Sequence, residues 1–204
     1  MFSTITNLFS ILLTVGLFYI ITKFIFDLLL RGFMPFIPSR PWVVEQILSE
    51  LEVPQENPRF YSLSSGRSGL FHALEKKYPN AVFIGAEYDF FPFIVAKVQT
   101  MIRKTKIKVI YSEPHRVKIR DADLIYSHLY PDKMRGLGRK FKFECKTGTQ
   151  IISTGFNFPT LSPKKLVELP DRKGKLTFFS KNQKLFQRKS QKYKKEKKAF
   201  FYEI

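Results

Sequence analysis

The chain of 204 residues has little cysteine, few acidic side chains and no charge at its amino end. Its lone cysteine, Cys145, cannot form an intramolecular disulfide, which excludes a disulfide-stabilised scaffold and favours a reducing compartment. The three histidines, His72, His115 and His128, show no metal-ligand spacing with that cysteine, so we predict no metal site. With 35 Lys and Arg against 17 Asp and Glu, the formal charge of +18 predicts an anionic partner.

The composition predicts a packed core. Hydrophobic residues make up 44% of the chain, and they include 22 phenylalanines and 9 tyrosines. Burial of so much aromatic surface compensates for the entropy lost on ordering a backbone, which excludes a disordered chain. The length fits one compact domain beside a short additional segment.

The amino end predicts a transmembrane anchor over residues 1–31. Residues 1–22 contain no charged side chain, and the apolar run extends to Phe26. About 20 such residues cross a bilayer as a helix. A signal peptide is the alternative, but no basic segment precedes the run and no small-residue cleavage site follows it. Because basic residues follow the run and none precedes it, we predict a single-pass membrane protein with its N-terminus outside and its remaining domain in the cytoplasm.

Residues 32–58 predict a stiff linker and a first helix. Pro35, Pro38 and Pro41 stop the membrane helix from continuing. Apolar residues then recur at helical spacing from Pro41 to about Leu51.

Residues 59–204 predict a Rossmann-like domain. Buried strands are expected over 59–64, 80–88, 108–111, 123–129 and 149–154, with helices over 66–78, 92–103 and 131–143. This alternation predicts an α/β fold with a mostly parallel sheet. After residue 164 strand-like pieces occur without a helix between them, which predicts an antiparallel terminal hairpin connected by the basic segment 181–198.

A glycine-containing turn and a following acid indicate a nucleotide-type site. The turn reads S-L-S-S-G-R-S-G at residues 62–69, and Gly66 precedes Glu87 by 21 positions. In a doubly wound fold, an acid about 20 residues after the turn accepts hydrogen bonds from a ribose diol. The alternative is an ordinary turn followed by an exposed glutamate at the end of a strand.

Five stretches carry a family resemblance: MPFIPSRPWVVEQIL, FYSLSSGRSG, FIGAEYDFFPFIVAK, ADLIYSHLYPDKM and GTQIISTGFNFP. In this order they resemble small membrane-anchored class I S-adenosylmethionine-dependent methyltransferases. Among these, the chain is similar to the mitochondrial protein-lysine methyltransferases that act on ATP synthase subunit c and the adenine nucleotide translocase, and to their bacterial relatives. The resemblance covers about residues 33–160.

The resemblance implies S-adenosyl-L-methionine as cofactor and assigns its contacts to the first turn, the ribose acid and the residue after the third strand. These positions are Ser62, Ser64, Gly66, Ser68, Glu87 and Glu113. The turn is degenerate, because serines stand where the family has an aspartate and glycines. A catalytically weak or inactive relative is therefore the alternative.

The residues around the end of the fourth predicted strand are candidates to line the channel for the methyl acceptor. They are Tyr126, His128, Tyr130 and Asp132, and each could instead have a purely structural role. By resemblance the acceptor is a protein lysine reachable at a membrane.

The basic segment 181–198 predicts contact with an anionic surface. It holds nine basic residues and one acid, with Phe186 and Tyr193 among them. For a chain tethered at a membrane we rank anionic lipid above RNA as its partner, and a solvated loop is the third reading.

Overall fold

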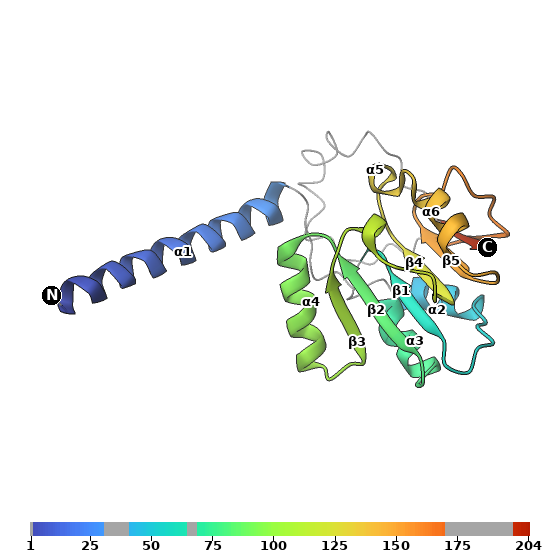
Figure 1. The fold of residues 1–204 in the computed structure, drawn as a ribbon, viewed down its shortest axis with the longest axis horizontal. Coiled ribbons are helices and arrows are strands. Elements are labelled where there is room, and N and C mark those ends of the chain that lie inside the picture. Colours follow the sequence, from blue (N-terminus) through green and yellow to red (C-terminus); the bar gives the residue numbers. More distant parts are fainter. Residues whose placement is uncertain (1, 31–40, 65–68, 170–197) are drawn as a thin grey trace. The chain divides into compact units, whose positions relative to one another are not determined.

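The computed structural model describes residues 2–30, 41–64, 69–169 and 198–204 (Figure 1). Helix α1 (Phe2–Leu30) belongs to one compact unit, and the described helices and strands from residue 41 onward belong to another. The predicted linker over residues 32–40 and nearly all of the basic segment 181–198 lie outside the described residues.

Helix α1 has the length and composition of a membrane span. Its window Thr6–Lys23 has a mean hydropathy of 1.5, and none of that window is buried within the protein. A helix of about 20 apolar residues can cross a bilayer, and an N-terminal signal sequence shares these properties.

The second unit is built on one sheet of seven strands in the order β3-β2-β1-β4-β5-β7-β6. The neighbouring pairs among β1 to β5 are parallel, whereas β7 is antiparallel to both β5 and β6. The predicted α/β fold with a mostly parallel sheet and an antiparallel terminal hairpin is confirmed. The strands are β1 (Arg59–Ser62), β2 (Val82–Glu87), β3 (Ile107–Tyr111), β4 (Leu124–Ser127), β5 (Gln150–Thr154), β6 (Lys165–Glu168) and β7 (Lys198–Glu203).

Two hydrophobic clusters cover the two faces of the sheet. Side chains alternate along a strand, so the neighbours Phe60 and Tyr61 of β1 belong to different clusters. Phe60 packs with residues of α2 (Pro41–Ser49) and α3 (Gly69–Lys77). Tyr61 packs in the cluster that contains Met134 of α5 (Pro131–Met134) and Phe141 of α6 (Leu137–Glu144). Helix α4 (Phe90–Ile102) packs against β2 and β3 at the edge of the sheet (Figure 1).

The single helix predicted over residues 131–143 is wrong. The structure has two helices there, and Gly136 separates them with a φ of 81°. That left-handed conformation is one that glycine adopts without steric cost, and it reorients the chain before α6 begins. Helix α4 also begins at Phe90, two residues before the predicted Pro92, because proline is tolerated in the first turn of a helix.

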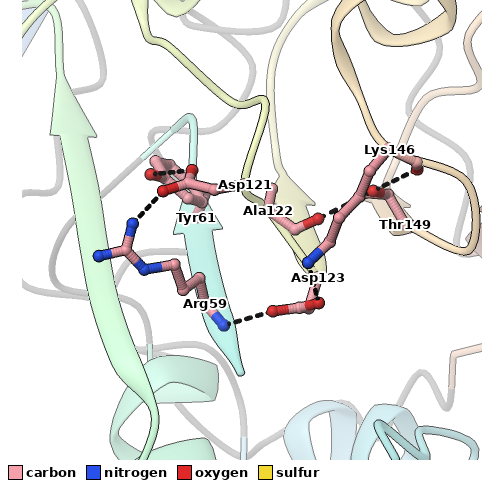
Figure 2. Close-up of polar contacts among 7 residues, drawn as sticks. All are labelled: Arg59, Tyr61, Asp121, Ala122, Asp123, Lys146 and Thr149. Atoms are coloured by element: carbon pink, nitrogen blue, oxygen red, sulfur yellow. Dashed lines mark hydrogen bonds and ion pairs between the residues drawn. The ribbon is translucent and has the colours of Figure 1, made fainter. Parts of the chain in front are cut away.

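A buried aspartate ties the amino ends of three parallel strands together (Figure 2). Asp123 is 4% exposed; its Oδ2 accepts the backbone N–H of Arg59 over 2.8 Å, and its Oδ1 pairs with Lys146 Nζ over 2.6 Å. Nearby, the Thr149 hydroxyl donates to the carbonyl of Ala122 over 2.8 Å. These interactions hold the amino ends of β1, β4 and β5 in place. A functional site is therefore expected in the loops at the carboxyl ends of the strands.

Candidate functional site

The strand order reverses between β1 and β4. From β1 the chain continues to β2 and β3 on one side, while β4 and β5 lie on the other side. In open α/β sheets ligands bind beyond the carboxyl ends of the strands at such a switch point. The candidate site is therefore built by the residues that follow β1, β2, β3 and β4.

Ser64 joins the loops on the two sides of the switch point. The backbone N–H of His128 donates to the Ser64 hydroxyl over 2.9 Å, and the N–H of Leu63 donates to the carbonyl of Tyr126 over 2.9 Å. Ser62, which ends β1, is completely buried beside them. Because the Ser64 oxygen accepts one bond, its own O–H proton can still be donated to a ligand. Gly66 and Ser68 lie outside the described residues.

Glu87 lies buried at the end of β2. Its side chain is only 4% exposed, and its backbone carbonyl accepts the N–H of Ser112 over 2.9 Å, which holds the loop after β3 beside it. Glu113 follows that loop, and its side chain is in a different environment from that of Glu87. Its carboxylate is 58% exposed and faces Arg116, whose Nε is 3.7 Å away. The buried Glu87 is thus the stronger candidate for a bidentate contact with a diol.

Thr154, at the end of β5, connects two of the predicted channel residues. Its Oγ1 is 3.1 Å from the Tyr126 hydroxyl and 2.7 Å from His128 Nδ1, and its carbonyl oxygen is 3.1 Å from the same nitrogen. A carbonyl oxygen can only accept, so we assign the proton to Nδ1, which leaves Nε2 as an acceptor. His128 is an exposed residue, and its ring is held at Nδ1 by Thr154.

Tyr88 links the end of β2 to the start of α5. Burial, followed by the charges of Asp89, Glu87 and Asp132, raises the pKa of the Tyr88 hydroxyl to about 12. The Nζ atom of Lys133 lies 5.1 Å from the centre of its ring. Burial therefore keeps this phenol protonated, and so a hydrogen-bond donor, well into the alkaline range.

Tyr130 and Asp132 occupy the outer part of the site. Tyr130 is 59% exposed, and its ring centre lies 5.8 Å from that of Phe156. Asp132 is exposed in the first turn of α5, where its charge acts on Tyr88. The structure thus joins His128 to Ser64 directly and to Tyr126 through Thr154, whereas Tyr130 lies against Phe156 and Asp132 acts on Tyr88.

Three polar side chains at this edge were missed from the sequence: Tyr88, Ser127 and Thr154. Each ends or directly follows a strand whose position was predicted, and that shared position was the available signal. Ser127 Oγ is completely buried and has no hydrogen-bond partner among the described residues. An unpartnered buried hydroxyl is costly, so a polar ligand at this edge would offset that cost.

A hollow lies at the opposite end of the sheet, around Gln150 at the start of β5. Its lysines already have partners, because Lys165 is ion-paired with Glu50 and Lys164 with Glu203. We therefore place the candidate site at the carboxyl edge.

No protein-family model matches this sequence, and no curated protein matches it. Solved structures share its fold. An RNA methyltransferase from Salinibacter ruber, in complex with S-adenosyl-L-homocysteine, aligns with a TM-score of 0.62 and 16% identity over 82% of this chain and 94% of that chain. Geranyl diphosphate C-methyltransferase from Streptomyces coelicolor A3(2) aligns with a TM-score of 0.58 and 9% identity over 78% of this chain and 77% of that chain. At such identities the similarity establishes the fold, which is the Rossmann-like methyltransferase fold.

Proposed function

We propose that the protein is an S-adenosylmethionine-dependent methyltransferase whose acceptor is a lysine of a membrane-associated protein. The observation that carries this proposal is the junction of Ser64 with His128 at the switch point, with the buried Glu87 one strand away. Both similar structures described above are methyltransferases with S-adenosyl-L-homocysteine bound, and they share the fold of this chain.

The residues at the carboxyl edge suit the cofactor. Glu87 would accept hydrogen bonds from the ribose diol of the cofactor. The hydroxyls of Ser62, Ser64 and Ser127 would face the polar groups of the cofactor. Gly66 and Ser68 of the turn would contribute to the same site. Glu113, which follows β3, would lie on the adenine side by family resemblance. When bound, S-adenosylmethionine supplies a methyl group on a sulfonium, which is transferred by in-line displacement.

The chain's own residues would position the acceptor and remove its proton. A lysine must be neutral to act as a nucleophile, and His128 Nε2 can accept a proton while Nδ1–H stays bound to Thr154. Tyr126 holds Thr154 from the other side. Tyr130 and Asp132 would line the entrance, where the exposed Tyr130 ring can cover the aliphatic part of a lysine and exclude water.

Membrane attachment belongs to the same proposal. Helix α1 has the composition to anchor the protein, with the N-terminus outside and the catalytic domain in the cytoplasm by the positive-inside rule. The basic segment 181–198 would contact anionic lipid on that side.

Binding of S-adenosyl-L-homocysteine to the detergent-solubilised full chain tests the cofactor site. Glu87→Gln should weaken binding about tenfold or more, because a neutral amide cannot accept both diol hydrogens equally well. Glu168→Gln removes an exposed carboxylate of β6 and should leave binding unchanged. Absence of binding to the unaltered chain would instead support the inactive relative that binds RNA or anionic membrane through its basic segment.

Transfer of a labelled methyl group into membranes tests the acceptor. We expect the label on a membrane protein, in acid-stable form on lysine. A labelled lipid, RNA or small molecule would overturn the lysine assignment and leave the cofactor assignment intact.

A further inference from the structure

Helix α4 packs on the sheet with small side chains and exposes large ones. Its buried residues are Pro92, Ala96 and Thr100. Five large apolar side chains are exposed, which we call the α4 stripe: Phe90 (65%), Ile94 (40%), Val98 (48%), Met101 (70%) and Ile102 (75%). At about 100° per residue these five fall within one arc of about 120°, opposite the buried line.

This arrangement is the reverse of an ordinary surface helix, which turns its polar residues to solvent. Single exposed apolar residues are common, but a contiguous stripe marks an interaction surface. At about 1.5 Å per residue, the 13 residues of α4 extend about 20 Å, which is too short to cross a bilayer. The length and the stripe suit a helix that lies in the plane of a membrane interface.

The charge around the stripe selects an anionic partner. Residues 90–111 contain five basic side chains and no acidic one. Lys97 flanks the stripe, with its Nζ 5.8 Å from the Phe93 ring centre, and Lys104 is exposed just beyond the end of the helix. A second copy of the chain would bring the same cations against one another, which opposes self-association through this face.

Aromatic side chains complete an interfacial pattern at the amino end of the helix. The rings of Phe90 and Tyr111 pack edge to face, with centres 6.1 Å apart, and Tyr111 is 56% exposed. A tyrosine with an apolar body and a polar tip suits the headgroup region. Phe90 follows Glu87 by three residues. A lipid contact at Phe90 would therefore lie at the carboxyl ends of the strands, as the candidate site does.

We propose that α4 lies in the surface of an anionic lipid bilayer, with the α4 stripe inserted among the headgroups and the surrounding lysines on anionic phosphates. This contact is distinct from the anchor and from the basic segment 181–198. It does not depend on methyl transfer, because none of its residues belongs to the candidate site.

Quenching of a single tryptophan by brominated lipid tests the insertion. The chain has one tryptophan, Trp42, so the full chain with Trp42→Phe provides a silent background. In vesicles of phosphatidylglycerol and phosphatidylcholine, Ile102→Trp should be quenched by bromine on the upper acyl chain. The control is Phe143→Trp on α6, an equally apolar position that is 87% exposed, and it should be quenched much less.

Two further measurements decide the cause of the quenching. Adding Ile94→Glu and Met101→Glu to the Ile102→Trp chain should abolish the quenching while the far-ultraviolet circular dichroism is retained, since both positions are exposed. Replacing phosphatidylglycerol with phosphatidylcholine should reduce it. Equal quenching at positions 102 and 143 would overturn the proposal. So would a blue shift at position 102 that grows with the protein-to-lipid ratio without bromine quenching, because that result indicates contact between copies.

Discussion

The backbone N–H of His128 donates to the hydroxyl of Ser64, so a side chain from the loop after β1 holds the loop after β4. A glycine at position 64, as the resembling family has it, would lack this bond. Ser64, which departs from the glycine of the family motif, therefore forms a contact across the switch point. This contact keeps His128 beside Thr154, where its ring is oriented.

Removing the Ser64 hydroxyl should destabilise this junction. Ser64→Ala leaves the N–H of His128 without its side-chain acceptor, which should lower the free energy of unfolding by about 1 kcal/mol. Ser64→Thr keeps the oxygen and should stay near the unaltered value. Urea unfolding of the detergent-solubilised chain measures both. Equal losses in the two variants would show that space around position 64 matters, and not its hydroxyl.

Thr154 should position His128 for catalysis. Thr154→Val keeps the side-chain shape but removes the oxygen near His128 Nδ1 and the Tyr126 hydroxyl. We expect kcat of methyl transfer to fall about tenfold, with little change in affinity for S-adenosyl-L-homocysteine, because the loss affects orientation of the base. Thr154→Ser should restore the rate.

Thr149→Val serves as the matched control. Thr149 is buried like Thr154, but its hydroxyl donates at the amino ends of the strands, away from the candidate site. The Thr149→Val variant should have a lower free energy of unfolding without a specific fall in kcat. If both valine variants lose kcat in parallel, Thr154 has only a structural role.

The sequence allowed the strands to be predicted because they are short, buried apolar runs. Ile151 and Ile152 of β5 are both completely buried, one toward each face, so the run is continuous. The break at Gly136 could not be predicted, because Met134, Leu137 and Phe141 keep helical spacing across it. What separates the two helices is the backbone conformation of one glycine.

The partners within the site were harder to predict than its location. Thr154 acquires its importance from the pairing of β5 with β4, which brings it beside residues 26 and 28 positions away. The α4 stripe could not be predicted from the sequence for another reason. The segment 90–102 is apolar on nearly every side, so its periodicity does not tell which face packs on the sheet.

Two neighbouring aspartates should differ sharply in their contribution to stability. Asp123 is buried, accepts the Arg59 N–H and is ion-paired with Lys146, so Asp123→Ala should lower the free energy of unfolding by about 2 to 4 kcal/mol. Asp121 bonds the Arg59 guanidinium and the Tyr61 hydroxyl, but its side chain is 47% exposed. Asp121→Ala should cost about 1 kcal/mol or less, since solvent screens that pair. Urea unfolding compares the two variants, and similar losses would contradict the role of burial.

Alkaline pH should destabilise the protein through Cys145. Burial, followed by the nearby charge of Glu144, raises the pKa of its thiol from 9.0 to about 12. The unfolded thiol ionises from about pH 9 while the folded thiol stays protonated, so this stability is complete below pH 9 and is lost as the pH rises toward 12. At about pH 10 the loss should be about 1.4 kcal/mol.

Cys145→Ser should flatten this dependence between about pH 8 and about pH 10 in urea unfolding. Tyr61 and Tyr88 contribute less than Cys145 over that range. Burial raises the pKa of each phenol from 10.0 to about 12, so each should cost only about 0.4 kcal/mol of stability by pH 10. An unchanged slope in Cys145→Ser would show that the thiol ionises as readily in the folded protein as in the unfolded chain. In that case Cys145 would also react rapidly with thiol reagents at about pH 9, whereas a partly buried thiol that stays protonated should react slowly.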